Sequence, residues 1–122
     1  MKSPHPKWTP AKFKAWVIAL LRRGTMRFPP RNEVLQAART ERKTNKATGK
    51  LAWHSKCSKC KKEFPSSKIV ADHIEPVVDV KTGFIDWNTY IDRMFCSKEG
   101  WQAICSTCHD KKSAKERKLR NV

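Results

Sequence analysis

Three motifs determine which folds this chain can adopt: CSKC at residues 57–60, VADHIEPV at residues 70–77 and CSTCH at residues 105–109. Four thiolates in two close Cys-x-x-Cys pairs suit a tetrahedral zinc ion. The pairs therefore predict a zinc site that clamps the ends of the intervening segment onto one another. The predicted zinc ligands are Cys57, Cys60, Cys105 and Cys108.

A chain of 122 residues has room for one compact domain, whose core gains little from burial alone. Metal binding adds directly to the folding free energy, so we expect the protein to unfold without zinc. The predicted fold class is α+β. A basic helical extension over residues 1–50 is expected to pack on a zinc-bound core over residues 51–122.

Cysteine usage favours a metal site over a disulfide scaffold. Five cysteines leave one unpaired, and we interpret the leftover Cys96 as a packed apolar residue. No segment has the pattern of a signal peptide or a membrane helix, since the longest apolar run is Ala15–Leu21. We therefore expect a protein of the reducing cytoplasm, without membrane association, in which thiols bind metal.

The net charge of +16 is concentrated at the two ends of the chain. Residues 1–56 carry 14 Lys and Arg against two acids, residues 57–110 carry seven against eight, and residues 111–122 carry six against one. An ordinary solvated surface mixes both signs, so this segregation favours a polyanionic partner. Because phosphate contacts release counterions and steer association, nucleic acid is the predicted partner of both basic flanks.

Two helical segments and a loop are predicted before the first cysteine pair. The first helix begins at Pro10 with Thr9 as its N-cap and ends at Gly24. The second is expected from Glu33 to about Arg42. Residues 43–50 (KTNKATGK) are interpreted as a flexible basic loop that can lie against phosphate.

Between the cysteine pairs, residues 68–71 form a short strand-like run that leads into Asp72 and His73. Asp86 is a suitable N-cap for a following helix. Ser106 is expected to cap a last helix that runs into the basic tail. The apolar face predicted for the helix after Asp86 consists of Trp87, Tyr90, Ile91, Met94 and Phe95.

Asp72, His73 and His109 are the candidates for catalysis, because the clamp brings His109 back towards the other two. Phosphodiester hydrolysis needs an activated water, a metal ion that neutralises phosphate charge, and stabilisation of the leaving oxygen. A neutral imidazole takes a proton from water, while a carboxylate and a second imidazole hold a divalent ion. Adjacent strand residues point to opposite faces, so Asp72 and His73 share one phosphate only where the strand ends or bends. Pro76 favours an early end.

In the order and spacing of these motifs the sequence resembles the HNH endonucleases, in the phage-type subgroup with a four-cysteine zinc site. The matching segments are residues 57–60, 70–77 and 105–112. The resemblance implies a strand hairpin packed on a helix around a catalytic metal, the ββα-metal core. It implies His73 as general base and Asp72 and His109 as ligands of a catalytic Mg²⁺ or Mn²⁺, with Ni²⁺ or Zn²⁺ serving in some members.

One residue of the family pattern has no counterpart here. The asparagine that orients the base usually lies just ahead of the second cysteine pair, where residues 99–105 read EGWQAIC. Asn88 is the only asparagine between His73 and His109. It is the candidate catalytic residue that orients His73, with a plain polar role in the first helical turn as the alternative. A weakened or inactive nuclease is a further alternative.

Rival interpretations remain open at this point. A zinc-containing nucleic-acid-binding module without activity would explain the charge and the cysteine pairs. His-Ile-Glu at residues 73–75, followed by the second pair, imitates a zinc nucleobase deaminase, but Ile104 stands where that pattern has proline. His109 or His54 can replace a cysteine in a Cys₃His site.

The function predicted is a metal-dependent DNA endonuclease whose N-terminal helices and C-terminal tail grip the phosphate backbone. A single site cuts one strand, so a monomer is expected to nick DNA once per event. It is expected to act in the cytoplasm, that of the host cell if a phage encodes it.

Overall fold

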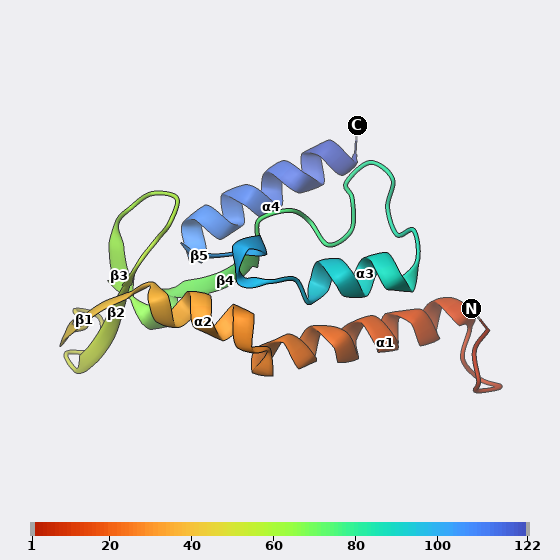
Figure 1. Cartoon of the computed structure of the whole chain (residues 1–122), viewed down its shortest axis with the longest axis horizontal. Coiled ribbons are helices and arrows are strands. Elements are labelled where there is room, and N and C mark those ends of the chain that lie inside the picture. The colour runs from red at the N-terminus through yellow and green to blue at the C-terminus, as the bar shows by residue number, and fades with distance from the viewer. Residues whose placement is uncertain (1, 122) are drawn as a thin grey trace.

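The computed structural model describes residues 2–121 and has the predicted α+β class. Figure 1 shows an elongated arrangement, with the sheet formed by β1, β2 and β3 at the end opposite the N-terminus. The helices of the described residues are α1 (Pro10–Gly24), α2 (Pro29–Ala37), α3 (Trp87–Met94) and α4 (Ser106–Arg120), with short 3₁₀ turns η1 (Thr25–Arg27), η2 (Ser66–Lys68) and η3 (Lys98–Gly100). The strands are β1 (Arg39–Thr44), β2 (Leu51–Lys56), β3 (Glu63–Pro65), β4 (Ile69–His73) and β5 (Trp101–Cys105).

Within residues 2–121 the strands form two antiparallel sheets, one in the order β1-β2-β3 and the other of β4 and β5. In the second sheet Asp72 lies opposite Gln102, and His73 lies opposite Trp101. Helix α4 follows β5 directly and packs against both strands of this pair. The strand expected around Asp72 and His73 is therefore confirmed, and it ends at His73.

The first predicted helix is confirmed in detail. The Thr9 side chain accepts a hydrogen bond from the Lys12 amide at 3.2 Å, Pro10 is the first residue of α1, and Gly24 is the last. Pro fits this position because the first helical N–H has no partner within the helix. The capped start thus fixes where α1 begins.

The second predicted helix is wrong at both ends, because α2 begins at Pro29 instead of Glu33 and ends at Ala37 instead of about Arg42. Residues 39–44 form β1, in which Thr44 lies opposite Leu51, and the Thr40 hydroxyl donates to the His54 carbonyl at 3.2 Å. Pairing with β2 outweighs the helix propensity of the Arg and Glu residues there. The basic loop is shorter than expected, because residues 43 and 44 belong to the strand. The boundary proposed at residue 50 falls inside a hairpin.

The predicted N-cap of α3 is confirmed, whereas the predicted N-cap of α4 is wrong. The Asp86 carboxylate accepts from the Thr89 amide at 2.7 Å, as predicted for α3. Helix α4 is capped by Cys105 instead of Ser106, because the Cys105 sulfur accepts from the Cys108 amide at 3.5 Å. His109 still lies in the first turn of α4. On the predicted apolar face of α3, Tyr90 and Met94 are buried, whereas Ile91 is 41% exposed.

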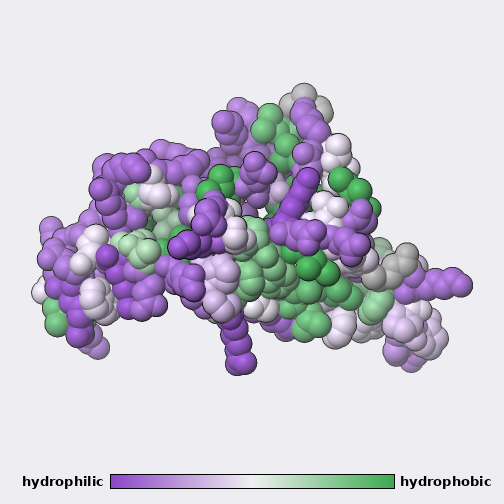
Figure 2. All heavy atoms as spheres, in the orientation of Figure 1, coloured by the Kyte–Doolittle hydropathy of each residue, from purple (hydrophilic) through white to green (hydrophobic). Residues whose placement is uncertain are grey.

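The core is small and contains sulfur. Cys57, Cys105, Ile69, Ala103 and Ile104 form its buried cluster. Partly buried apolar side chains of α2 and β3 pack against it. Hydrophilic side chains cover most of the face seen in Figure 2. None of the helices in residues 2–121 combines the length and apolar character needed to cross a membrane.

Candidate functional site

The first candidate site is a cluster of four cysteine sulfurs. The Sγ atoms of Cys57, Cys60, Cys105 and Cys108 all lie within 4.8 Å of one another. The Sγ atoms of Cys60 and Cys105 are 3.9 Å apart. Metal–sulfur bonds of about 2.3 Å in a tetrahedron place the sulfurs about 3.8 Å apart, so the cluster has the dimensions of a metal site.

Backbone amides donate hydrogen bonds to two of the sulfurs and so stabilise negative charge on them. The Cys60 amide donates to the Cys57 sulfur, and the Cys108 amide donates to the Cys105 sulfur, each at 3.5 Å. Burial raises the pKa of the Cys57 thiol, but hydrogen bonds from the Cys105, Cys60 and Lys59 backbone outweigh it and lower the pKa to about 6. The thiol of Cys57 is therefore readily ionised.

The pKa of the Cys108 thiol shifts in the opposite direction, upwards. Its hydrogen bond with Cys105 and its burial raise the pKa of Cys108 to about 12. Thiols packed this closely cannot all carry negative charge unless a cation is among them. A bound metal cation supplies that charge, so the chemistry of the four donors fits a structural metal.

The alternative ligands lie elsewhere. Among the described residues, His73, His109 and His54 are not part of the sulfur cluster. The His54 ring is buried and its Nδ1 contacts the Ala52 carbonyl at 3.1 Å. Cys96 also lies outside the cluster and is partly buried, and burial raises its pKa. These placements disfavour a Cys₃His site, and they separate His73 from the cysteines that a deaminase would need.

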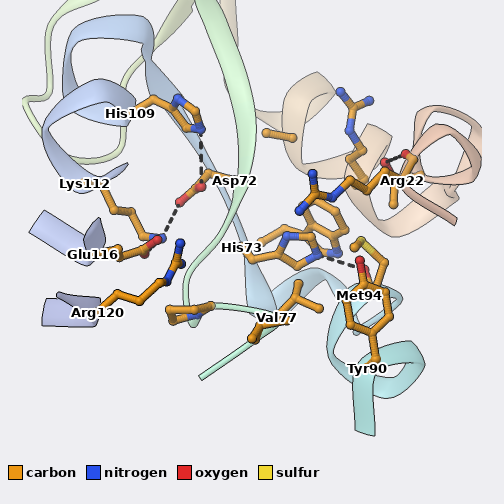
Figure 3. Close-up of a pocket in the computed structure, with 16 residues that line it drawn as sticks. Arg22, Asp72, His73, Val77, Tyr90, Met94, His109, Lys112, Glu116 and Arg120 are labelled. Atoms are coloured by element: carbon orange, nitrogen blue, oxygen red, sulfur yellow. Dashed lines mark hydrogen bonds and ion pairs between the residues drawn. The ribbon is translucent and has the colours of Figure 1, made fainter. Parts of the chain in front are cut away.

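The second candidate site is a pocket of about 380 Å³ between β4, α3, α4 and the end of α1. Figure 3 shows its lining, with Asp72 facing α4 and His73 facing α3. Although adjacent strand residues diverge, Asp72, His73 and His109 all line this one pocket. Because β4 ends at His73, both side chains reach the same space.

Asp72 is the centre of an ionic network. Its Oδ1 lies 3.7 Å from Nε2 of His109, while its Oδ2 lies 3.2 Å from Nζ of Lys112 and accepts from Gln102 Nε2 at 3.0 Å. Lys112 also contacts a Glu116 oxygen at 2.5 Å. Burial lowers the pKa of Lys112, but the hydrogen bond to Glu116 and the charge of Asp72 outweigh it and raise the pKa. Lys112 therefore stays charged beside Asp72.

The Asp72 and His109 side chains are close enough to reach one divalent ion after a small approach. Their ligand atoms are 3.7 Å apart. Adjacent ligands of an octahedral ion with bonds of about 2.1 Å lie about 3.0 Å apart, so the two atoms must close by about 0.7 Å to hold Mg²⁺. Two protein ligands suffice for Mg²⁺, which usually keeps waters and substrate phosphate oxygens in its remaining positions. The Asp72 oxygen that faces His109 is Oδ1, whereas Lys112 contacts Oδ2.

The His73 ring is fixed from two sides. Its Nε2 lies 2.8 Å from the carbonyl oxygen of Met94. A carbonyl only accepts, so Nε2 carries the hydrogen and Nδ1 of the neutral ring has the free lone pair. The ring also packs on Trp101, with centroids 3.9 Å apart, and the Trp101 indole donates to the Cys96 carbonyl at 3.2 Å. Orientation and tautomer are thus both set.

Asn88 lies in the first turn of α3, exposed to solvent, and does not line the pocket. It precedes Met94 by six residues, which corresponds to about 9 Å along a helix axis. The structure brings the Met94 carbonyl to His73 and leaves Asn88 outside the pocket. An orienting role for Asn88 stays a prediction.

Several residues of the pocket escaped the sequence reasoning. Arg22 at the end of α1, Arg31 in α2 and Arg120 at the end of α4 all line it, as does Lys112. The Tyr90 hydroxyl, also in the lining, is buried without a hydrogen-bond partner among residues 2–121. The sequence held one signal for these residues: Lys112 and Glu116 follow His109 at an i, i+4 spacing, which predicts an ion pair on the surface of a helix.

Comparisons with known proteins identify no family: no family model, no curated protein and no solved structure matches this chain.

Proposed function

We propose that this protein is a metal-dependent endonuclease of the HNH type that hydrolyses phosphodiester bonds in DNA. The observation that carries the proposal is the convergence of His73, Asp72 and His109 on one pocket with four cationic side chains. The antiparallel β4–β5 pair followed by α4 supports an assignment as the ββα-metal core.

In this proposal His73 is the general base. Its Nε2–H is engaged by the Met94 carbonyl at 2.8 Å, so Nδ1 accepts a proton from water. The packing on Trp101 keeps the ring from turning. The Met94 carbonyl acts as the orienting group that the family usually supplies with asparagine.

Asp72 and His109 would hold the catalytic ion, Mg²⁺ or Mn²⁺. When bound, the ion neutralises charge on the scissile phosphate and stabilises the departing oxygen. Lys112 and Gln102 hold the second carboxylate oxygen of Asp72, which fixes the direction in which its first oxygen points. His109 approaches from the first turn of α4 and is about two-fifths exposed, so incoming phosphate can reach it.

The arginines give the pocket its affinity for phosphate. Arg22, Arg31 and Arg120 come from three different helices and surround the pocket together with Lys112. The two carboxylates of the lining, Asp72 and Glu116, both pair with Lys112. The arginine charges are therefore left to interact with a polyanion.

We assign zinc to the four-cysteine cluster, since a closed Cys₄ site is the usual structural zinc site. The cluster joins the turn after β2 to the junction of β5 and α4. It thereby holds His109, one residue after Cys108, near the end of β4. Its role is structural, and the chemistry belongs to the pocket.

Supercoiled plasmid tests the proposal. The zinc-loaded protein is expected to convert it to nicked circles, and then to linear DNA, only with added Mg²⁺ or Mn²⁺. His73→Ala should lower the rate by at least about 100-fold while retaining DNA binding. The matched control is His54→Ala, which removes a histidine outside the pocket. Equal cleavage by wild type and His73→Ala would refute the assignment of the base. Binding without cleavage under any metal would support a nucleic-acid-binding module instead.

A further inference from the structure

The β1–β2 hairpin carries charge that the pocket does not use. Figure 1 shows it projecting at the end of the molecule away from the N-terminus, and hydrophilic side chains dominate this end in Figure 2. All six residues of β1 are exposed. Residues 39–53 include five Lys and Arg against one acid, and none of them lines the pocket that contains His73.

One face of the hairpin combines cations with exposed apolar groups. Arg42 lies opposite Trp53, and Thr44 lies opposite Leu51, and residues opposite one another in an antiparallel pair share a face. The Arg39 guanidinium lies 5.2 Å from the centre of the Trp53 ring, which puts it on this face too. Trp53 is 41% exposed and Leu51 is 59% exposed. We call Arg39, Arg42, Leu51 and Trp53 the ribbon face.

On the opposite face of the hairpin, the lysine of β1 is paired with acidic side chains. Lys43, opposite Ala52, forms ion pairs with Glu63 and Glu41, and the Thr40 hydroxyl donates to Glu63 at 2.5 Å. By contrast, neither arginine of the ribbon face has an acidic partner within 4.0 Å anywhere in residues 2–121. Of the three cations of β1, the two without an acidic partner are therefore both on the ribbon face.

We propose that the ribbon face binds duplex DNA in the major groove beside the cut site. This inference rests on the proposed function, because it takes DNA as the substrate. Strands of six residues extend about 20 Å, and a two-stranded ribbon fits the major groove, which is about 12 Å wide. The two guanidiniums contact phosphates or base edges, and Trp53 packs against the groove wall or a thymine methyl.

The base of the hairpin is fixed to the strands that carry the pocket. The Lys56 amide donates to the Ala38 carbonyl at 2.9 Å, which closes the base of the hairpin itself. The Ser58 amide, two residues after β2, donates to the Ala103 carbonyl of β5 at 2.9 Å and ties the hairpin to that strand. Strand β5 in turn pairs with β4, which carries Asp72 and His73. A duplex held by the ribbon face is therefore held at a set position relative to the pocket.

The test measures duplex binding by zinc-loaded full-length protein without added Mg²⁺ or Mn²⁺. Fluorescence anisotropy with a duplex of about 30 base pairs gives Kd over a range of salt concentrations. Arg42→Glu is expected to weaken binding at least tenfold and to lower the salt slope by about one to two, since each phosphate contact contributes about 0.9. Trp53→Ala should weaken binding severalfold with little change in slope. The control Lys98→Glu makes the same charge change at an exposed site in η3 and should stay within about twofold of wild type.

Melting curves check that each variant is folded, and Arg42→Gln repeats the test with a milder change. The proposal is overturned if the hairpin variants bind duplex as tightly as Lys98→Glu does. It is also overturned if they lose affinity only for single strands, or if they change self-association and not DNA binding. Plasmid cleavage separates the two proposals. If the hairpin variants bind DNA more weakly but the wild-type protein does not cleave, only the nuclease is refuted. If the wild-type protein cleaves but the hairpin variants bind DNA normally, only the role of the ribbon face is refuted.

Discussion

Removal of the metal from the four-cysteine cluster is expected to unfold the protein. The cluster joins Cys60 to Cys105 across 45 positions of the chain. Closing a loop of this length contributes about 4 kcal/mol by the entropy expression for a covalent cross-link. A whole domain is stable by only about 5–15 kcal/mol, and the large buried side chains here are few. For a chain of this size 4 kcal/mol corresponds to a fall in Tm of roughly 15 °C.

Circular dichroism melts and a zinc-release dye measure this effect. Cys60→Ser should lower the Tm by at least about 15 °C and reduce the zinc content, and a strong chelator should abolish the cooperative melt. Cys96→Ser is the matched control, because Cys96 lies outside the cluster. It should shift the Tm by only a few degrees. A chelated protein or a Cys60→Ser variant that melts within about 3 °C of wild type would show that the cluster does not stabilise the fold through a metal.

Three further predictions concern the pocket and its support. Arg22→Ala should raise KM for plasmid severalfold and reduce its salt dependence, whereas Arg23→Ala, an exposed neighbour outside the pocket, should change neither. Because the pKa of Cys57 is lowered from 9.0 to about 6, the stability tied to its thiolate is fully present above pH 9 and is lost as the pH falls through 6. Zinc binds thiolates and competes with protons for them, so zinc release should increase as the pH falls in a dye titration. Met94→Leu keeps the carbonyl that holds His73, so kcat should stay within about twofold; a large loss at unchanged Tm would contradict the main-chain role.

The sequence contained enough information for the elements that depend on local signals. Thr9 with Pro10 fixed the start of α1, and Asp86 fixed the start of α3, because caps act within a few residues. The spacing of the cysteine pairs predicted the sulfur cluster, since a tetrahedral site needs two pairs of close donors. These features need no knowledge of what lies far away in the chain.

Features that depend on distant contacts were missed. Residues 39–42 read as a helix, and only pairing with residues 51–55 makes them a strand. The arginines of the pocket were counted as general phosphate-binding charge, because nothing local says that α1 ends beside β4. The contact between the Met94 carbonyl and His73 involves the main chain, so no residue type in the sequence could have predicted it.

The charges of the pocket have a consequence for how its ligands bind. Four cationic side chains face two carboxylates, and both carboxylates already pair with the same lysine. A divalent ion entering this pocket alone meets a net positive surrounding, which opposes its binding. A phosphate group brings negative charge to the same place and supplies oxygen ligands that complete the coordination of the ion. Metal and DNA should therefore bind with positive cooperativity, each raising the affinity for the other by the same factor, because their coupling free energy is reciprocal.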